Sequence, residues 1–562
     1  MTLKKDMCIT LNITDMGTNG EGIGKIEGFP LFVKDAVIGD VIEAKIIKLK
    51  KSYGYGRMMK VLEPSKDRVE AKCPVARQCG GCQIQEMSYD AQLSWKQELV
   101  RNNLERIGGI TEYEMYPVIG MTEPFHFRNK AQFPVGENKD GEIVIGFYAG
   151  RTHYIVENMD CCIGVKVNTE ILKIVKEYMK SNNIRPYNEE KHTGVVRHVL
   201  IRSGYHTGEL MVCLIINSSN KACLKNADIL IRNLQAVDGM VSIMVNFNTD
   251  KTNVILGDSS EVLWGRSYIE DYIGDVRFQI SPQSFFQVNP QQTEKLYSKA
   301  LEYAALTGNE TVWDLYCGIG TISLFLAKNA RKVYGVEIVP QAIEDARNNA
   351  RLNGIENAEF FVGKAEEVVP KFYEEAAKRA AAGDNEEAER SINPDVVVVD
   401  PPRKGCDETL IDTIVKMQPE RIVYVSCDSA TLARDLKILS AKGYCVKKVQ
   451  PVDQFGHSVH VETVCLLSKL HADQHIEVEL QMDELDLTAA ESKATYEEIK
   501  DYVLEHTGLK VSNLYIAQIK QKCGIIERVN YNLPKSENSR QPKCPPEKEK
   551  AIREALEHFR MI

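Results

Sequence analysis

The chain has 562 residues, of which 43% are hydrophobic and 27% charged, and its formal net charge is -9. This length predicts several domains, and this composition excludes wholesale disorder. No apolar run reaches the roughly 20 residues of a membrane helix, and residues 1–6 lack a signal-peptide core, so we expect a cytoplasmic protein without a membrane partner. Its fifteen cysteines indicate metal binding or catalysis rather than a disulfide scaffold.

The first 63 residues alternate short apolar runs with glycines, which predicts a small closed β-barrel. Strands are expected at residues 9–13, 31–33 and 41–47, and turns at 17–22 and 54–56. From Lys45 to Lys60 every charged residue is basic, and two tyrosines lie among them. Such a face can hold a phosphate backbone and stack bases on its rings. The alternative is a strand edge that lysines protect from pairing.

The middle of the chain, residues 64–275, mixes strands and helices without a repeat. From about residue 276 the two alternate, and the apolar runs at 312–315, 332–336, 395–399 and 421–425 are typical of buried parallel strands. We expect a doubly wound α/β sheet over residues 276–470. Residues 365–390 are rich in acids and alanine and predict a solvated helix and loop.

A candidate cofactor site begins at residues 312–323, where a predicted strand runs through a glycine turn into a helix. Gly318 and Gly320 let a ligand approach the backbone in front of a helix N-terminus, but the third glycine of the dinucleotide fingerprint is absent. Glu337 ends the next strand, twenty-three residues after Asp314, where a carboxylate can accept hydrogen bonds from both ribose hydroxyls. The pattern indicates a nucleoside without a pyrophosphate, such as S-adenosylmethionine. A plain glycine turn is the alternative.

Three further polar residues lie at or near the ends of strands. Asp400 is followed by Pro401 and Pro402, which stiffen a turn at the edge of the sheet where ligands bind in such folds. Cys427 stands at the start of a predicted helix, whose positive end favours a thiolate. Glu462 lies in an otherwise apolar strand, where a carboxylate is costly unless paired or functional. A proline-capped strand end and a buried thiol are the structural alternatives.

A thiolate and a carboxylate together suit methyl transfer to C5 of a pyrimidine. The thiolate adds to C6, C5 takes the methyl group from a sulfonium, a base removes the C5 proton, and elimination releases the cysteine. Cys427 and Glu462 are the candidates for these roles. His457 and His460 flank the glutamate and are better explained as structural histidines.

Five motifs resemble those of the RNA uracil-C5 methyltransferase family, over about residues 5–468. They are SPQSFFQVN at 281–289, DLYCGIG at 314–320, DPPR at 400–403, SCD at 426–428 and HVE at 460–462. The resemblance implies that Cys427 is the nucleophile and that Glu462 takes the C5 proton. It implies an RNA-binding TRAM domain at the N-terminus, and it assigns S-adenosylmethionine binding to Gln287, Tyr316, Glu337 and Asp400.

A cysteine cluster adds a second candidate site. Cys73, Cys79 and Cys82 lie in one glycine-bearing loop, which is typical of a metal or cluster site. The resembled family has its fourth cysteine followed by any residue and then an aliphatic one, which implies Cys161, with Cys162 as the alternative. By that likeness the cysteines hold a [4Fe–4S] cluster that folds the central domain. A zinc site with four thiolates is the runner-up.

The cluster makes the family branch that modifies 23S ribosomal RNA the closer likeness. We therefore expect a monomeric S-adenosylmethionine-dependent RNA (uracil-C5)-methyltransferase whose target base leaves its stack. The same reaction in the transfer RNA T-loop is the nearest rival. A non-catalytic iron–sulfur RNA-binding or assembly protein is disfavoured because Cys427 and Glu462 are both present, and an amino-group methyltransferase because Arg403 follows the prolines. The aromatic and basic residues 125–130 fit RNA contacts as well as a strand entry.

The expected fold is multidomain α/β: a TRAM-like barrel (1–63), a central α+β iron–sulfur domain (64–275), a Rossmann-like methyltransferase sheet (276–470) and a tail (471–562). Residues 471–500 hold nine acids and two lysines and predict an acidic linker. Residues 492 to about 524 predict two short helices separated near Gly508, and a loose loop at 534–546 and a last helix at 547–559 follow. Residues 501–562 carry eleven Lys and Arg against eight acids, which favours added RNA contacts. Docking on the core or on a protein partner is the alternative.

Overall fold

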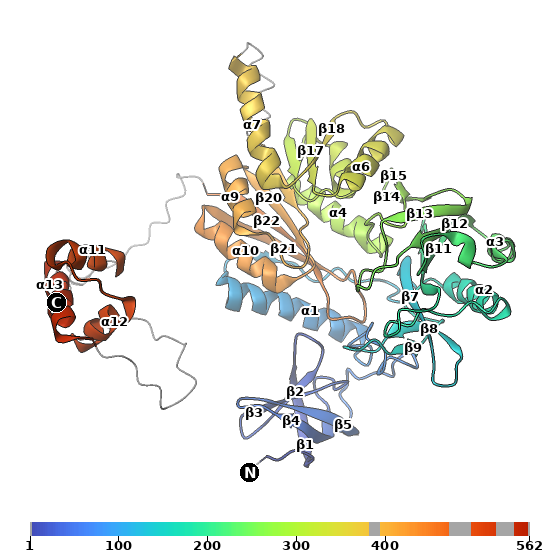
Figure 1. Ribbon diagram of the computed structural model, residues 1–562, viewed down its shortest axis with the longest axis horizontal. Helices are drawn as coiled ribbons and strands as arrows, with labels where there is room; N and C mark the ends of the chain where they lie inside the picture. The colour runs from blue at the N-terminus through green and yellow to red at the C-terminus, as the bar shows by residue number, and fades with distance from the viewer. Residues whose placement is uncertain (1–2, 382–393, 471–495, 524–543, 560–562) are drawn as a thin grey trace. The chain divides into compact units, whose positions relative to one another are not determined.

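The computed structural model describes residues 3–381, 394–470, 496–523 and 544–559, drawn in colour in Figure 1. The chain divides into two compact units, Met1–Ala472 and Asp473–Ile562. No helix among the described residues is long and apolar enough to cross a membrane.

The N-terminal segment forms the expected closed barrel of five strands, in the order β1-β2-β3-β5-β4. Alternate side chains such as Leu11, Ile13 and Ile42 point inward and are buried. The strands are β1 Cys8–Met16, β2 Gly22–Ile26, β3 Phe29–Val33, β4 Val41–Leu49 and β5 Gly54–Glu63.

The turn expected at residues 54–56 is wrong, because these residues begin strand β5, which pairs with β3. A Cβ atom on Gly54 would lie 2.7 Å from Leu31, and one on Gly56 would lie 3.1 Å from Val33. The two glycines therefore let the strands approach closely.

The central segment forms a seven-stranded sheet in the order β13-β12-β11-β10-β7-β8-β9. Every residue of β11 is buried, which explains its continuous apolar run. Helices α2 Val167–Ser181 and α3 Ala227–Gln235 contribute to the core of this sheet. The strands are β7 Lys130–Glu137, β8 Ile143–Tyr148, β9 Ile155–Glu157, β10 Val196–Ser203, β11 Leu210–Ile216, β12 Met240–Phe247 and β13 Ser259–Gly265, followed by a hairpin of β14 Ile269–Ile273 and β15 Val276–Ile280.

The third segment forms an eight-stranded sheet in the order β18-β17-β16-β19-β20-β22-β21-β6. Neighbours from β18 to β20 run parallel, and β22 is antiparallel. The four strands predicted from apolar runs are all present. The strands are β16 Thr311–Asp314, β17 Lys332–Glu337, β18 Ala358–Val362, β19 Val396–Val399, β20 Arg421–Ser426, β21 Tyr444–Val452, β22 Glu462–Lys469 and β6 Glu114–Met115. The helices are α1 Tyr89–Asn103, α4 Pro290–Ala304, α5 Thr321–Ala327, α6 Pro340–Leu352, α7 Ala365–Ala381, α9 Glu408–Met417 and α10 Ser429–Ala441.

An early segment joins this late sheet. Strand β6 pairs with β21. Val100, in the last turn of α1, and Leu104, directly after it, belong to the same core as the strands. Residues 365–381 form the expected helix, α7, but only part of its surface is solvated, because Val369 is buried and Phe372 packs 5.1 Å from Trp313, ring centre to ring centre. Residues 382–393 lie outside the described part.

The second unit contains the three helices expected in the tail: α11 Tyr496–Thr507, α12 Asn513–Lys522 and α13 Pro546–His558. Gly508 separates the first two with a φ of +70°. The helices share a core to which Ile499, Ile516 and Ile552 contribute. Residues 496–500, which lie both in the acidic stretch and in the first predicted helix, belong to α11. The rest of the acidic linker and most of the loop expected at 534–546 lie outside the described residues.

Candidate active site and cysteine pocket

The carboxyl ends of the parallel strands open on one cavity of about 730 Å³. This is the edge where doubly wound sheets bind ligands. The cavity brings together all six residues that the sequence predicts for the reaction and its cofactor. They are Gln287, Tyr316, Glu337, Asp400, Cys427 and Glu462.

The glycine turn after β16 shapes one wall of this cavity. Gly318 has a φ of +53° and Gly320, which precedes α5, has a φ of +83°, a conformation that favours glycine. Asp314 is fully buried and accepts a hydrogen bond from the hydroxyl of Ser323 at 2.6 Å. Burial raises the pKa of Asp314 to about 6. Glu337 ends β17, and one of its carboxylate oxygens accepts a hydrogen bond from the amide of Val339 at 3.0 Å.

Gln287 and Tyr316 offer polar groups to a ligand. Neither side chain has a hydrogen-bond partner among the described residues, although Gln287 is only 5% exposed. The loop that carries Gln287 is held from below by the buried guanidinium of Arg202, which donates to the carbonyls of Pro282, at 3.3 Å, and Ser284. The Gln287 amide is therefore presented from a fixed loop.

Asp400 and Glu462 are carboxyl groups of the cavity whose pKa values are both raised. Burial and the neighbouring Asp314 raise the pKa of Asp400 to about 7. Burial, followed by repulsion from Asp400, raises the pKa of Glu462 well above its usual value, while Arg403 opposes the shift. One carboxyl oxygen of Glu462 is buried without a hydrogen-bond partner in the described structure. A buried carboxyl group left unpaired in a cavity is a strong candidate for a functional group.

Cys427 lies between β20 and α10, as expected, but its helix does not stabilise a thiolate. The amides of Ala430 and Thr431 both donate to the Asp428 carboxylate at 3.0 Å, so this side chain occupies the helix N-terminus. Burial, and then the charge of Glu462, raise the pKa of Cys427 to about 12. The free protein therefore holds Cys427 as a thiol at neutral pH.

Sequence reasoning gave no role to several residues that line the same cavity. Arg403 approaches His460 with 3.4 Å between the guanidinium and ring nitrogens, and Phe285 is 66% exposed. Arg403 and Phe285 lie within the motifs at 400–403 and 281–289, so these motifs could have indicated both residues. Of the two histidines, His460 lines the cavity and His457 does not.

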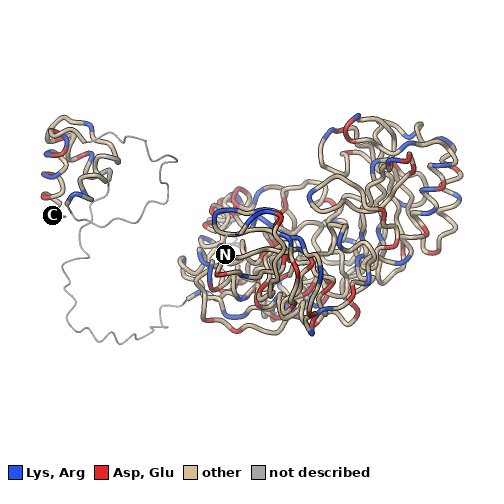
Figure 2. The backbone as a smooth tube through the Cα atoms, turned by 90° about the horizontal axis from the view of Figure 1, so that it is seen from below, with Lys and Arg blue, Asp and Glu red and all other residues tan. Residues whose placement is uncertain are grey.

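The barrel presents a basic and aromatic surface. The rings of Phe32, Tyr53 and Tyr55 lie 5.7 to 5.9 Å apart, centre to centre. Lys50 and Lys51, in the turn beside them, are exposed. Figure 2 shows blue positions along the strands near the N-terminus. This face combines the charge and the rings that single-stranded nucleic acid needs.

A second cavity, of about 210 Å³, is lined by five cysteines: Cys73, Cys79, Cys82, Cys161 and Cys162. All five are free thiols. The sulfur of Cys79 accepts from the amide of Gly81 at 3.4 Å, and that of Cys162 accepts from the Gln85 side chain at 3.5 Å. Within the described ranges, no group of three or more His, Cys, Asp or Glu side chains is placed to hold a metal ion. The predicted ligands thus line one cavity.

Arg128, one of the residues considered for an RNA contact, lines this cysteine cavity. Its Nε donates to the carbonyl of Lys130 at 3.1 Å, and no described carboxylate forms an ion pair with it. Burial lowers the pKa of Arg128, and Cys161 and Cys82 oppose that shift. A partly buried cation without an acid beside thiols suits a cavity whose thiols are ionised.

Comparison with known proteins gives consistent matches. The tRNA (uracil-5-)-methyltransferase family model matches residues 88–470, and the TRAM domain model matches residues 8–59. An uncharacterized RNA methyltransferase of Halalkalibacterium halodurans is 50% identical over 466 residues, which cover 83% of this chain and 98% of that protein. One of Clostridium tetani is 48% identical over 466 residues, covering 83% of this chain and 97% of that protein.

A solved structure is also similar over most of the chain. It is the crystal structure of Pyrococcus abyssi tRNA (uracil-54, C5)-methyltransferase in complex with S-adenosyl-L-homocysteine. It has a TM-score of 0.63 and 29% sequence identity, and the match covers 82% of this chain and 100% of that one.

Proposed function

Because this chain belongs to the tRNA (uracil-5-)-methyltransferase family, and so to the S-adenosylmethionine-dependent RNA methyltransferases, we propose that it methylates C5 of a uridine in 23S ribosomal RNA. The observation that carries the proposed chemistry is the shared cavity, in which Cys427 and Glu462 lie beside the four residues assigned to the cofactor.

The proposed reaction begins at Cys427. Its thiol loses a proton to solvent as the sulfur adds to C6 of the uracil, and the electron pair of the C5–C6 double bond moves toward C5 and O4. S-adenosylmethionine, when bound, supplies a methyl group on a positively charged sulfur. Gln287, Tyr316, Glu337 and Asp400 would hold that cofactor, since all line the cavity. Burial is the main reason that the pKa of Cys427 is raised, and a positive charge there would offset the further contribution of Glu462 and Asp400.

Glu462 completes the proposed reaction as a base. Its carboxylate takes the C5 proton of the methylated adduct, the C5–C6 double bond forms again, and the bond between C6 and the Cys427 sulfur breaks. The raised pKa of Glu462 makes its ionised form a stronger base. The partnerless carboxyl oxygen of Glu462 is available for that proton.

The choice of RNA can be tested in cells that lack this protein. We expect one or more 5-methyluridines to disappear from 23S ribosomal RNA, while transfer RNA keeps its own. The second candidate substrate is the transfer RNA T-loop, which the similarity to the Pyrococcus abyssi tRNA enzyme favours. Loss of 5-methyluridine from transfer RNA alone would replace the first substrate by the second.

For the cysteine cavity we propose a [4Fe–4S] cluster held by Cys73, Cys79, Cys82 and Cys161. Five thiols and the unpaired Arg128 around one cavity support an anionic group with thiolate ligands. No step of the proposed reaction transfers an electron, so the role of these residues is structural. Zinc is the alternative occupant.

Anaerobically purified protein should be brown and contain about four irons per chain, the content of one such cluster. Serine at Cys73, Cys79 or Cys82 should remove iron and soluble yield together. Serine at Cys161 should do the same, whereas serine at Cys162 should keep the iron. Metal analysis of each variant checks this, and stoichiometric zinc without iron in the parent protein would establish the zinc site instead.

We also propose that the chain has four parts, residues 1–63, 64–275, 276–470 and 471–562, and that the last part binds RNA. Both family models end by residue 470, so the tail lies outside them. If helices α11 to α13 add phosphate contacts, removing residues 471–562 should weaken RNA binding and flatten its dependence on salt. The rate at saturating RNA should hardly change, because the cavity lies wholly upstream. An unchanged salt slope would exclude RNA contacts by the tail.

A further inference from the structure

The loop between β21 and β22 leads directly into Glu462 and carries Phe455 and His460 to the wall of the active-site cavity. Buried polar contacts hold its first half. Lys96 of helix α1 and Asp453 are both fully buried, with 2.5 Å between the Lys96 Nζ and an Asp453 carboxylate oxygen. The same Nζ donates to the carbonyl of Phe455 at 3.0 Å.

The centre of this loop is His457, whose backbone is left-handed. Its φ is +64°, a conformation that few residues other than glycine and asparagine adopt without strain. The His457 amide donates to the side chain of Gln92, also on α1, at 3.0 Å. The imidazole ring of His457 stacks on Phe125 with 4.5 Å between ring centres. The residue is therefore fixed from one side by the helix and the ring.

The cysteine loop fixes His457 from the other side. The carbonyl of His457 accepts two hydrogen bonds, from the amides of Gln83 at 3.0 Å and Ile84 at 3.1 Å. These two residues directly follow Cys82, which lines the cysteine cavity. The amide of Val459 donates in turn to the Gln83 side chain at 3.4 Å.

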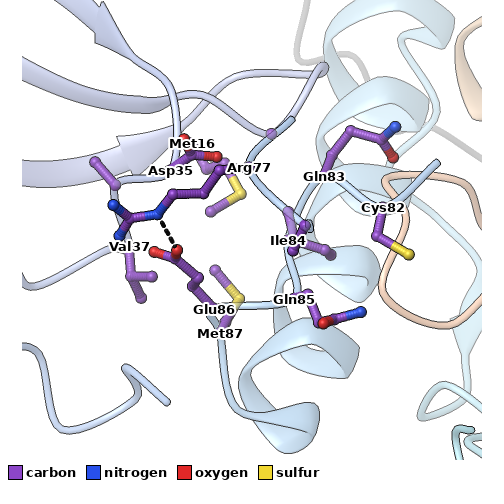
Figure 3. Close-up of a pocket in the computed structure, with 13 residues that line it drawn as sticks. Met16, Asp35, Val37, Arg77, Cys82, Gln83, Ile84, Gln85, Glu86 and Met87 are labelled. Atoms are coloured by element: carbon purple, nitrogen blue, oxygen red, sulfur yellow. Dashed lines mark hydrogen bonds and ion pairs between the residues drawn. The ribbon is translucent and has the colours of Figure 1, made fainter. Parts of the chain in front are cut away.

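The barrel side of the cysteine segment is also anchored. Figure 3 shows Arg77 and Glu86 paired on one side of the segment and Cys82 on the other. Glu86 also pairs with Arg68, which in turn pairs with the fully buried Asp40 of the barrel. The segment whose amides hold the His457 carbonyl is thus held to the barrel by ion pairs, and its Cys82 lines the cysteine cavity.

We propose that His457 is a positioning residue through which the cysteine loop sets the place of the Glu462 carboxylate. Four residues separate the two, and β22 begins at Glu462, so a backbone shift at His457 is passed along a short loop to the start of that strand. The proposal rests on the proposed role of Glu462 as the base. It gives the cysteine cavity a catalytic consequence without any electron transfer, because an ordered cysteine loop supplies the two amides that hold the His457 carbonyl.

The test compares His457→Val with His457→Asn. Both variants lose the imidazole, but valine is branched at Cβ and disfavours a positive φ, whereas asparagine accepts it. With ordinary uridine RNA, the valine variant should form the methylated adduct and release it slowly. Protein covalently attached to RNA should then accumulate, with kcat about 100-fold lower, the size of loss that a small misplacement causes. S-adenosylmethionine binding and iron content should match the parent protein, and the asparagine variant should turn over nearly as the parent does.

A second variant distinguishes loss of positioning from a folding defect in His457→Val. Gln92→Met removes the side chain that accepts from the His457 amide and should give the same trapped adduct. A valine variant with normal turnover would overturn the proposal. So would equal losses in the valine and asparagine variants, or loss of turnover without an adduct in both His457→Val and Gln92→Met. Glu462→Gln, assayed beside them, distinguishes failure of this proposal from failure of the proposed function. Normal release of product by Glu462→Gln would exclude Glu462 as the base. A trapped adduct in Glu462→Gln, but in neither His457→Val nor Gln92→Met, would exclude only the positioning role of His457.

Discussion

Replacing Cys427 with alanine should abolish methylation of RNA while leaving S-adenosylmethionine binding largely intact. Cys427 is the thiol of the cavity proposed to bond with C6, and without that bond C5 is not nucleophilic enough to take a methyl group. Turnover on RNA and cofactor binding, measured on the same preparation, check this expectation. Substantial residual turnover would exclude the covalent mechanism.

A modified substrate and a control variant make the test of Cys427→Ala more specific. RNA with 5-fluorouridine at the target cannot give up a proton from C5, so the parent protein should remain bonded to it and the alanine variant should not. Cys445→Ala is the matched control, because Cys445 lies near the start of β21, has a free thiol and does not line the cavity. The control should form the adduct like the parent protein. If it fails to do so, the loss in Cys427→Ala does not report on the nucleophile.

The candidate active site was predictable because its residues follow strands that the sequence marks clearly. Four apolar runs identify β16, β17, β19 and β20, and parallel strands place their carboxyl ends at one edge of a sheet. Asp400 and Cys427 each follow such a run, so their meeting in one cavity needs no further information. Glu462 begins an antiparallel strand that pairs with β20, and its register brings it to the same edge.

The chemical state of the site was not predictable, because it depends on contacts between distant segments. The positive end of α10 suggested a thiolate at Cys427, but Asp428 takes the free amides of that helix, and the Glu462 carboxyl adds to the effect of burial. Similarly, residues 125–130 look like an RNA-binding stretch, yet Arg128 turns to the cysteine cavity. Asp428 is the neighbour of Cys427, but Glu462 lies 35 residues from Cys427, and Cys161 lies 33 residues from Arg128, so the sequence around Cys427 and Arg128 does not show these contacts.

The fold departs from the sequence-based expectation for the same reason. Strand β6 has only two residues and lies some three hundred residues before β21, its partner in the sheet. The buried face of helix α1 includes Gln92 and Lys96 as well as Trp95 and Val100, and its sequence does not say which core it joins. The structure places Val100 in the core of the methyltransferase sheet and Lys96 against Asp453. These contacts join α1 to the sheet and to the loop between β21 and β22, and only the three-dimensional arrangement shows them.

Replacing Glu462 with glutamine should stop the reaction after methyl transfer. Glutamine keeps the shape of the side chain but cannot take the C5 proton, so addition and methylation proceed and elimination stalls. Turnover should fall by about 10²–10⁴-fold, the usual contribution of a positioned base. Protein bonded to methylated RNA should accumulate and be visible on a denaturing gel when the transferred methyl group is labelled. Product release at the normal rate would show that another group takes the proton.

The rate of elimination at acid pH and the variant Asp400→Asn distinguish loss of a base at Glu462 from a general disturbance of the cavity. Burial and Asp400 raise the pKa of Glu462, so the carboxyl stays protonated to higher pH and elimination by the parent protein should slow as pH falls. The trapped adduct of Glu462→Gln should not respond to pH in this way, because the group that titrates is gone. Asp400→Asn should instead lose S-adenosylmethionine binding and accumulate no methylated adduct, since the methyl group never arrives. If both variants trap the adduct equally, Glu462 has no distinct part in removing the proton.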